Sequence, residues 1–236
     1  MTEQIKIINQ DCIEHIKTLK DNSINFVLTD PPYILDTVGG GIIANREYLN
    51  EIKADKIDKG FNIPEFLNSL MRLFETKEHY NAVFFCSKLQ ILDYLKWATD
   101  NKLQYGLGVW HKTNPPPLCK GKYLSNVEYF IYIKGNAVRI EGEYKDKSLV
   151  YTSGINRKDK QLYKHPTIKP IEILEKFLTL HTKENDIVYD PFLGSGSTAI
   201  ACLNKNRKCI GVELLEEYYD TANKRIDAHK ATLSKE

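Results

Sequence analysis

Four consecutive residues, Asp30-Pro31-Pro32-Tyr33, carry the clearest chemical signal in this sequence. They follow a predicted strand, and two consecutive prolines can neither continue a strand ladder nor lie inside a helix, so the chain must turn there. The Asp30 carboxylate and the Pro31 carbonyl can both accept hydrogen bonds from one exocyclic amino group. The Tyr33 ring can stack on an aromatic ring. The turn could therefore bind a flat heterocyclic amine; a structural turn with a core tyrosine is the alternative.

Three further acidic residues, Asp11, Asp190 and Glu213, also lie at or just beyond the end of a predicted strand. In an open α/β sheet, ligands bind outside the carboxyl ends of the strands, where the strand order reverses. Carboxylates that meet there could bind the hydroxyl, amino and ring-nitrogen groups of a nucleoside-bearing ligand. Each acid could instead cap the helix after its strand. The glycine- and proline-rich turns beside these acids favour the ligand site.

The Gly194-Ser195-Gly196 turn lies between a predicted strand and the next helix. Glycine permits a tight turn and lets a ligand approach the backbone, while the helix N-terminus offers free amide groups. Glu213 ends the following strand, where nucleoside-binding folds place an acid for the ribose. The turn is not GxGxxG and no GK[ST] follows, which argues against a P-loop.

Strands and helices alternate along the chain, which predicts an α/β fold with a doubly wound, mostly parallel sheet. The predicted strands are residues 5–9, 24–29, 81–86, 106–111, 126–133, 187–189 and 209–212. The predicted helices are residues 12–19, 63–74, 89–97, 171–180, 199–203 and 214–226. Residues 34–60 contain three consecutive glycines and only weak periodicity, so we expect a long mobile loop there.

The 236 residues, 42% of them hydrophobic and 27% charged, are typical of one globular domain. The five cysteines are widely spaced and form no CxxC pair, so we expect neither a disulfide framework nor a zinc site. The sequence has no apolar run of signal-peptide or membrane-spanning type. We therefore expect a reduced, cytoplasmic protein without a membrane partner or a bound metal.

The net charge of +2 hides an uneven distribution. Between Trp110 and Pro170 the sequence has 12 Lys or Arg against 5 Asp or Glu, a net charge of +7, which leaves −5 elsewhere. Basic side chains that neutralise phosphates give salt-dependent affinity for DNA, although a run of charge is more often a solvated surface. Seven of these residues are candidate DNA contacts: Lys112, Lys120, Lys122, Arg139, Arg157, Lys158 and Lys160.

Together these motifs resemble the amino-directed DNA methyltransferases, in the order of their beta class, where the catalytic DPPY motif precedes the cofactor motif. The likeness covers nearly the whole chain as a single domain, residues 1–236. It rests on DPPY together with four other segments: residues 9–12 (NQDC), 165–170 (HPTIKP), 190–198 (DPFLGSGST) and 211–219, which contain Glu213 and two tyrosines. The chain has Ile34 where the family often has Asn after DPPY. The implied fold is the Rossmann-like sheet of class I methyltransferases with a small inserted target-recognition segment, residues 134–164.

The resemblance implies methyl transfer from S-adenosylmethionine to an exocyclic nitrogen of a base that is flipped out of double-stranded DNA. Catalysis is assigned to Asp30, Pro31, Pro32 and Tyr33. The residues implied to bind the cofactor are Asp11, Cys12, Asp30, His165, Thr167, Lys169, Asp190, Phe192, Gly194, Ser195, Gly196, Ser197 and Glu213. Because DPPY in this family favours adenine, N6 of adenine is the expected target. Analogy with the family also suggests a homodimer.

Three other functions remain open from the sequence. The first is a methyltransferase acting on cytosine N4 or on RNA. The second is a nicotinamide-dependent oxidoreductase that uses the Gly194–Gly196 turn, which leaves DPPY unexplained. The third is a non-catalytic DNA-binding protein, against which the intact acidic residues argue. Phe85 could line the base pocket or belong to the core, and we expect His111 to pack beside Trp110 rather than to act in chemistry.

Overall fold

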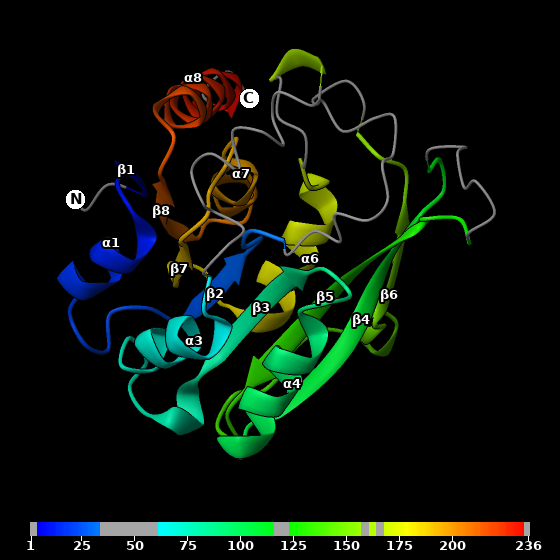
Figure 1. Cartoon of the computed structure of the whole chain (residues 1–236). Helices are drawn as coiled ribbons and strands as arrows, with labels where there is room; N and C mark the ends of the chain where they lie inside the picture. The colour runs from blue at the N-terminus through cyan, green and yellow to red at the C-terminus, as the bar shows by residue number, and fades with distance from the viewer. Residues whose placement is uncertain (1–3, 34–60, 116–122, 157–160, 164–167, 234–236) are drawn as a thin grey trace.

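One sheet of eight strands runs through the molecule (Figure 1). The computed structural model describes residues 4–33, 61–115, 123–156, 161–163 and 168–233. The strands, in chain order, are β1 (Ile5–Asn9), β2 (Phe26–Thr29), β3 (Asn81–Cys86), β4 (Gln104–Lys112), β5 (Val127–Lys134), β6 (Val150–Ser153), β7 (Ile187–Asp190) and β8 (Lys208–Glu213). Their order across the sheet is β1-β8-β7-β2-β3-β5-β4-β6.

The described sheet is mostly parallel, as the sequence predicts. β5 alone among these strands runs antiparallel to its neighbours, β3 and β4. All other pairs are parallel. From β7 the chain continues to β8 on one side, whereas from β2 it continues to β3 on the other. The order therefore reverses between β7 and β2, which is where open α/β sheets bind their ligands.

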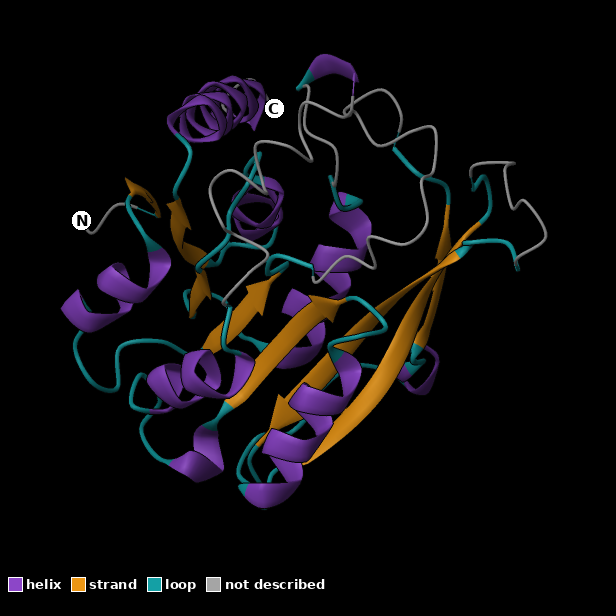
Figure 2. Ribbon diagram, viewed as in Figure 1, coloured by secondary structure: helices purple, strands orange, loops and turns teal. Residues whose placement is uncertain are grey.

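Helices cover both faces of the sheet (Figure 2). Helices α1 (Cys12–Thr18), α3 (Ile63–Met71) and α4 (Ile91–Asp100) pack on one face, and α6 (Ile171–His181), α7 (Ser197–Asn204) and α8 (Glu216–Leu233) pack on the other. Successive strand side chains point to opposite faces. Thus Val27 belongs to the first apolar core while its neighbours Phe26 and Leu28 belong to the second. Two short 3₁₀ helices, η1 (Lys77–His79) and η2 (Tyr144–Lys147), complete the regular elements of the described residues.

The segment 134–164 contains one strand that the sequence analysis does not predict. β6 pairs in parallel with β4 at the outer edge of the sheet. Trp110 of β4 donates a hydrogen bond from Nε1 to Ser153 Oγ of β6, at 2.9 Å. The predicted mobile loop, residues 34–60, lies outside the described residues.

None of the helices in the described part of the chain combines the length and apolar character needed to cross a bilayer. Within the same ranges, no group of three His, Cys, Asp or Glu side chains is arranged to hold a metal ion.

Candidate active site

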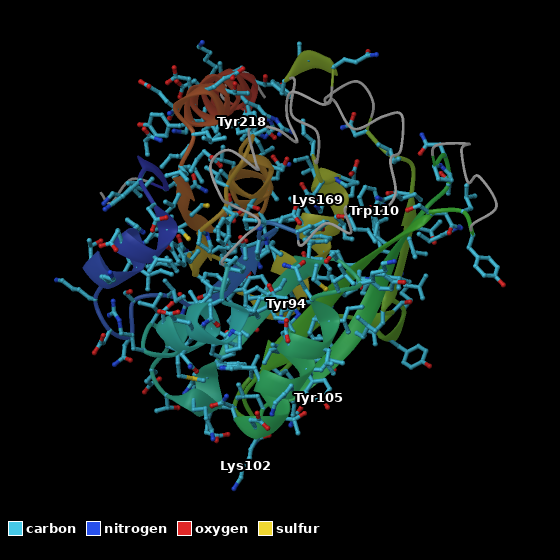
Figure 3. All side chains as sticks on the ribbon, viewed as in Figure 1. Tyr94, Lys102, Tyr105, Trp110, Lys169 and Tyr218 are labelled. Carbon is cyan, nitrogen blue, oxygen red and sulfur yellow. The ribbon has the colours of Figure 1, made fainter. Side chains whose placement is uncertain are left out.

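The carboxyl ends of β1, β2, β7 and β8 surround a cavity of about 260 Å³. All four acids that the sequence places at strand ends line it: Asp11, Asp30, Asp190 and Glu213. The DPPY turn, Phe85, Lys169 and the turn from Asp190 to Ser195 line it as well. Figure 3 shows Lys169 and Trp110 at this end of the sheet, with Tyr105 and Lys102 at the other. The fold therefore brings together functional side chains that are widely separated in the sequence.

The DPPY turn is fixed by a side chain from the segment before α4. Gln90 is buried and donates a hydrogen bond from Nε2 to the Pro32 carbonyl, at 2.8 Å. Its Oε1 accepts a hydrogen bond from the Ser87 backbone amide, at 3.0 Å. The Pro32 carbonyl lies beyond the end of β2, and this side-chain bond satisfies it as an acceptor. The turn is thus tied to the end of β3.

Asp30 forms an ion pair with Lys169, a residue that the sequence assigns to the cofactor. Lys169 Nζ donates to Asp30 Oδ2, and Asp30 Oδ1 is buried and has no hydrogen-bond partner within the described residues. The ammonium lies over two rings, 4.8 Å from the Phe85 centroid and 5.6 Å from that of Tyr33. Phe85 is a buried core residue that also lines the cavity.

Glu128, at the start of β5, is a site residue that sequence reasoning missed. Its Oε1 accepts hydrogen bonds from Tyr33 Oη and Lys169 Nζ, both at 2.8 Å. Its Oε2 accepts from Lys112 Nζ at 2.6 Å. A lone carboxylate at the start of an otherwise apolar strand is the signal that could have identified it, because acids are rarely buried without a partner.

The protonation states of this cluster follow from burial and from the two lysines. Burial alone would raise the pKa of Glu128, but the charges of Lys169 and Lys112 outweigh it and lower that pKa to about 2. Burial favours the neutral amine of Lys169, but Asp30 and Glu128 outweigh this and raise its pKa. Burial also raises the pKa of Asp30, with Lys169 opposing the shift. Lys169 and Glu128 are therefore charged at neutral pH.

Asp190 joins the two strands at the reversal point. Thr29 Oγ1, at the end of β2, donates to Asp190 Oδ1 at 2.6 Å, and the Phe192 amide donates to the same oxygen at 3.1 Å. Burial raises the pKa of Asp190 to about 6, against the opposing hydrogen bonds from Thr198, Thr29 and Phe192. This carboxylate is ionised at neutral pH but close to its titration range.

The other two acids cap backbone groups as well as lining the cavity. Asp11 caps α1, accepting from the amides of Ile13 and Glu14 at 2.9 and 3.0 Å. Glu213 accepts from the amides of Gly194 and Leu215, at 2.8 and 2.9 Å. Asp11 and Glu213 therefore do both things that the sequence analysis considered: they cap backbone amides and they line the cavity. Cys12 lines the cavity beside Asp11, and burial raises its pKa to about 12, so its thiol stays neutral.

The Gly194–Ser197 turn needs its glycines. Gly194 and Gly196 have φ of +55° and +83°, conformations that L side chains rarely adopt. Arg225 of α8 is buried beneath the turn and donates to the Ser195 carbonyl at 3.2 Å and to Ser197 Oγ at 2.9 Å. The Tyr163 ring stacks on its guanidinium, with 4.5 Å between Cζ and the ring centroid. Phe192 also lines the cavity and contacts Phe61 and Phe66.

The candidate DNA contacts lie in different places. Lys112 is mostly buried and paired with Glu128. Arg139 lies near Asn25, which comes just before β2, and Asn81, which begins β3. It is therefore at the amino ends of these strands, opposite the cavity. Five others, Lys120, Lys122, Arg157, Lys158 and Lys160, lie outside the described residues, as do His165 and Thr167. Contact of all seven basic residues with DNA stays a prediction.

The chain matches a family model described as DNA methylase, of the N6/N4 methyltransferase type, over residues 24–224. The Type II methyltransferase M2.DpnII of Streptococcus pneumoniae is 27% identical over 96% of this chain and 91% of its own length. The putative methylase YubD of Escherichia coli (strain K12) is 30% identical over 94% of this chain and 90% of its own.

Solved structures agree with these sequence matches. The complex of M1.HpyAVI with S-adenosylmethionine has a TM-score of 0.72 at 29% identity, covering 94% of this chain and 99% of that chain. PvuII DNA methyltransferase, which is cytosine-N4-specific, shares the fold with a TM-score of 0.70 at 16% identity, covering 100% of this chain and 95% of that one. The expected class I methyltransferase fold is therefore confirmed.

Proposed function

Starting from the membership of this chain in the DNA methylase family, with S-adenosylmethionine as cofactor, we propose that it methylates N6 of adenine in double-stranded DNA. The observation that carries transfer to an exocyclic amine is Asp30 Oδ1, a buried acceptor without a hydrogen-bond partner among the described residues, in a residue that lines the cavity. The choice of adenine rests on the resemblance of the DPPY motif. A buried acceptor without a partner is costly, so a ligand donor is expected to satisfy it. An exocyclic amino group supplies such a donor.

The walls of the cavity suit the chemistry of S-adenosylmethionine. Three of its acids, Asp11, Asp190 and Glu213, suit a ligand that carries ribose hydroxyls, an adenine amine and a net positive charge. The Gly194–Ser197 turn offers the backbone at the start of α7. When bound, the cofactor supplies an electrophilic methyl group on a sulfonium ion. Of the other residues assigned to it, His165 and Thr167 remain predictions from the family motif.

The residues of the DPPY turn bind and orient the base. We propose that Asp30 Oδ1 and the Pro31 carbonyl accept the two amine hydrogens, which directs the nitrogen lone pair toward the methyl group. The Tyr33 ring stacks on the base, while Phe85 and Lys169 close the cavity beneath it. These groups are held by the fold before substrate arrives, so positioning and electrostatic preorganisation supply the rate enhancement.

Three wider expectations accompany this proposal. Residues 134–164 serve in target recognition, within a restriction–modification setting suggested by the Type II methyltransferase M2.DpnII. The protein acts in the cytoplasm. It forms a homodimer, which sedimentation velocity would detect as a species of twice the mass of the 27.2 kDa chain.

The test is methylation of unmethylated plasmid DNA by the purified protein, followed by nucleoside digestion and mass spectrometry. We expect N6-methyladenine from wild type and a loss of at least about a hundredfold for Asp30→Ala, because the amine acceptor is removed. The exposed Asp100→Ala is the control, since Asp100 pairs with Lys96 on the surface of α4, away from the cavity-lining residues. N4-methylcytosine as the sole product would refute the adenine assignment, and retained activity in Asp30→Ala would refute the catalytic one.

A further inference from the structure

Glu128 makes contacts that the methyl-transfer chemistry described above does not use. We propose that Glu128 is a positioning residue for the reaction and that Lys112 serves as its charge partner rather than as a phosphate contact. This inference rests on the proposed function, because the groups that Glu128 holds are those assigned to binding the target base.

The first step is geometric. Tyr33 Oη donates to Glu128 Oε1 at 2.8 Å, which anchors the hydroxyl end of the tyrosine ring. The same oxygen accepts from Lys169 Nζ at 2.8 Å. Glu128 thus contacts the stacking residue of the DPPY turn directly, from a strand that lies two places from β2 in the sheet.

The second step concerns Asp30. Lys169 bridges Glu128 Oε1 and Asp30 Oδ2, so its ammonium is held from two sides. With Oδ2 engaged by Lys169, Oδ1 is the Asp30 carboxylate atom left without a partner within the described residues, and Asp30 lines the cavity. Without Glu128, Lys169 would retain Asp30 as its one carboxylate partner within the described residues, and its ammonium would be held from one side instead of two. Glu128 therefore acts on the amine acceptor through Lys169.

The third step is charge balance. The cluster pairs two carboxyl groups, Asp30 and Glu128, with two amino groups, Lys112 and Lys169, and all four side chains are at most 21% exposed. Removing one member of a buried ionic cluster leaves an uncompensated charge, which is strongly unfavourable. Lys112 also lies over the Trp110 ring, 4.8 Å from Nζ to the ring centroid. Its ammonium is thus directed into the protein and toward Glu128.

The experiment compares wild type with Glu128→Gln, using methyl transfer from radiolabelled S-adenosylmethionine to plasmid DNA. We expect kcat to fall by about ten- to a hundredfold, while KM for DNA and the Kd for S-adenosylmethionine change less than threefold. The split follows because Glu128 is not among the residues that line the cavity and acts on the base through Tyr33 and Lys169. Glu184→Gln, an exposed glutamate on the turn before β7, is the matched control and should behave as wild type.

Two further variants separate positioning from mere stability. Adding Lys112→Met to Glu128→Gln restores the charge balance and keeps an amide oxygen near Tyr33, so kcat should recover to within about fivefold of wild type. In a double-mutant cycle, Tyr33→Phe should lower kcat strongly in the wild-type background. It should lower kcat far less in the Glu128→Gln background, since that variant has already altered the hydrogen bond between Tyr33 Oη and residue 128. If Glu128→Gln does not fold, Tyr33→Phe and Lys112→Met alone still test both contacts. Lys112→Met should lower kcat and leave the salt dependence of DNA binding unchanged.

The outcomes distinguish this inference from the function on which it rests. A wild-type protein that methylates no DNA would overturn the proposed function. Wild-type activity together with an unaffected Glu128→Gln, or with additive effects in the cycle, would overturn the positioning role alone. A reduced salt slope in Lys112→Met would show that this lysine contacts phosphate and would refute its assignment as charge partner.

Discussion

Two buried residues, His181 and Asp190, titrate in overlapping pH ranges with opposite effects on stability. His181 stacks on Phe26 and shares a hydrogen bond with Asn81, and burial lowers its pKa to about 4. As pH drops, His181 binds a proton in the unfolded chain before it does so in the folded protein. The free energy of unfolding therefore falls between about pH 6.5 and pH 4. Asp190, with its pKa raised to about 6, binds a proton more readily when folded, so stability falls as pH rises from about 4 to 6.

The two effects, each on the order of 3 kcal/mol, therefore oppose each other between about pH 4 and 6. We predict that His181→Gln makes the free energy of unfolding decline more steeply than in wild type as pH rises through this window. Asp190→Asn should do the reverse and make stability rise with pH. Urea unfolding at several values between pH 4 and 7 measures both. Parallel curves for wild type and either variant would contradict the assignment of that residue.

The Asp190 carboxylate also makes the affinity for S-adenosylmethionine depend on pH. S-adenosylmethionine carries a net positive charge, so an ionised Asp190 attracts it and a protonated one does not. Because the pKa of Asp190 is about 6, we predict that affinity weakens by about tenfold on going from pH 7.5 to pH 5. Asp190→Asn should bind more weakly at pH 7.5 and lose most of this dependence. Isothermal titration calorimetry at several pH values measures the affinity. If the affinity of Asp190→Asn depended on pH as strongly as that of wild type, Asp190 would be excluded as the origin of the effect.

At the scale of elements, the C-terminal helix supports the cofactor turn. Arg225 of α8 contacts Ser195 and Ser197, and Tyr163 stacks on its other side. A lysine at this position keeps the charge but lacks the planar group that bonds and stacks at once. We predict that Arg225→Lys weakens S-adenosylmethionine binding by about three- to tenfold while kcat at saturation stays within twofold. The neighbouring Lys224→Arg, which is exposed, is the control. A fall in kcat with unchanged Kd would contradict this role.

The elements also show what the sequence could and could not predict. Strands such as residues 81–86 and 187–190 were predictable because buried parallel strands read as short apolar runs that end at a turn. β6 was not, because its four residues lie at an edge, half exposed, in a basic segment without periodicity. The predicted end of one helix at Phe74 also ran past its real end at Met71. Arg72 donates there to the carbonyls of Leu19 and Ile16, a long-range contact that local patterns do not contain.

The candidate site divides in the same way. Asp11, Asp30, Asp190 and Glu213 were found because each follows a strand, and the ends of parallel strands meet at one edge of the sheet. Glu128 was missed because β5 runs antiparallel, so its residue at this edge comes at the start of the strand. Its partners depend on the order of strands in the sheet, and that order is a property of the whole fold.

At the scale of the whole molecule, the direction of the strands decides which basic residues can reach DNA near the base cavity. β4 and β6 end at the same edge as the DPPY turn, and β5 begins there. Arg139 follows the end of β5 and so lies at the opposite edge, near Asn25 and Asn81. Among the described basic residues of this stretch, Lys112 therefore lies at the end of the sheet that holds the site and Arg139 at the opposite end.

The salt dependence of DNA binding tests this division. Each phosphate contact contributes about 0.9 to the slope of log Kobs against log salt concentration on duplex DNA. We predict that Lys158→Ala with Lys160→Ala lowers the magnitude of that slope by about 1.8, because both residues belong to the segment that follows β6. Arg139→Ala should leave it unchanged, since its guanidinium lies at the other edge of the sheet. Fluorescence anisotropy with a labelled duplex, from 50 to 300 mM salt, measures the slopes. An equal loss in Arg139→Ala would mean that DNA wraps past the amino ends of the strands.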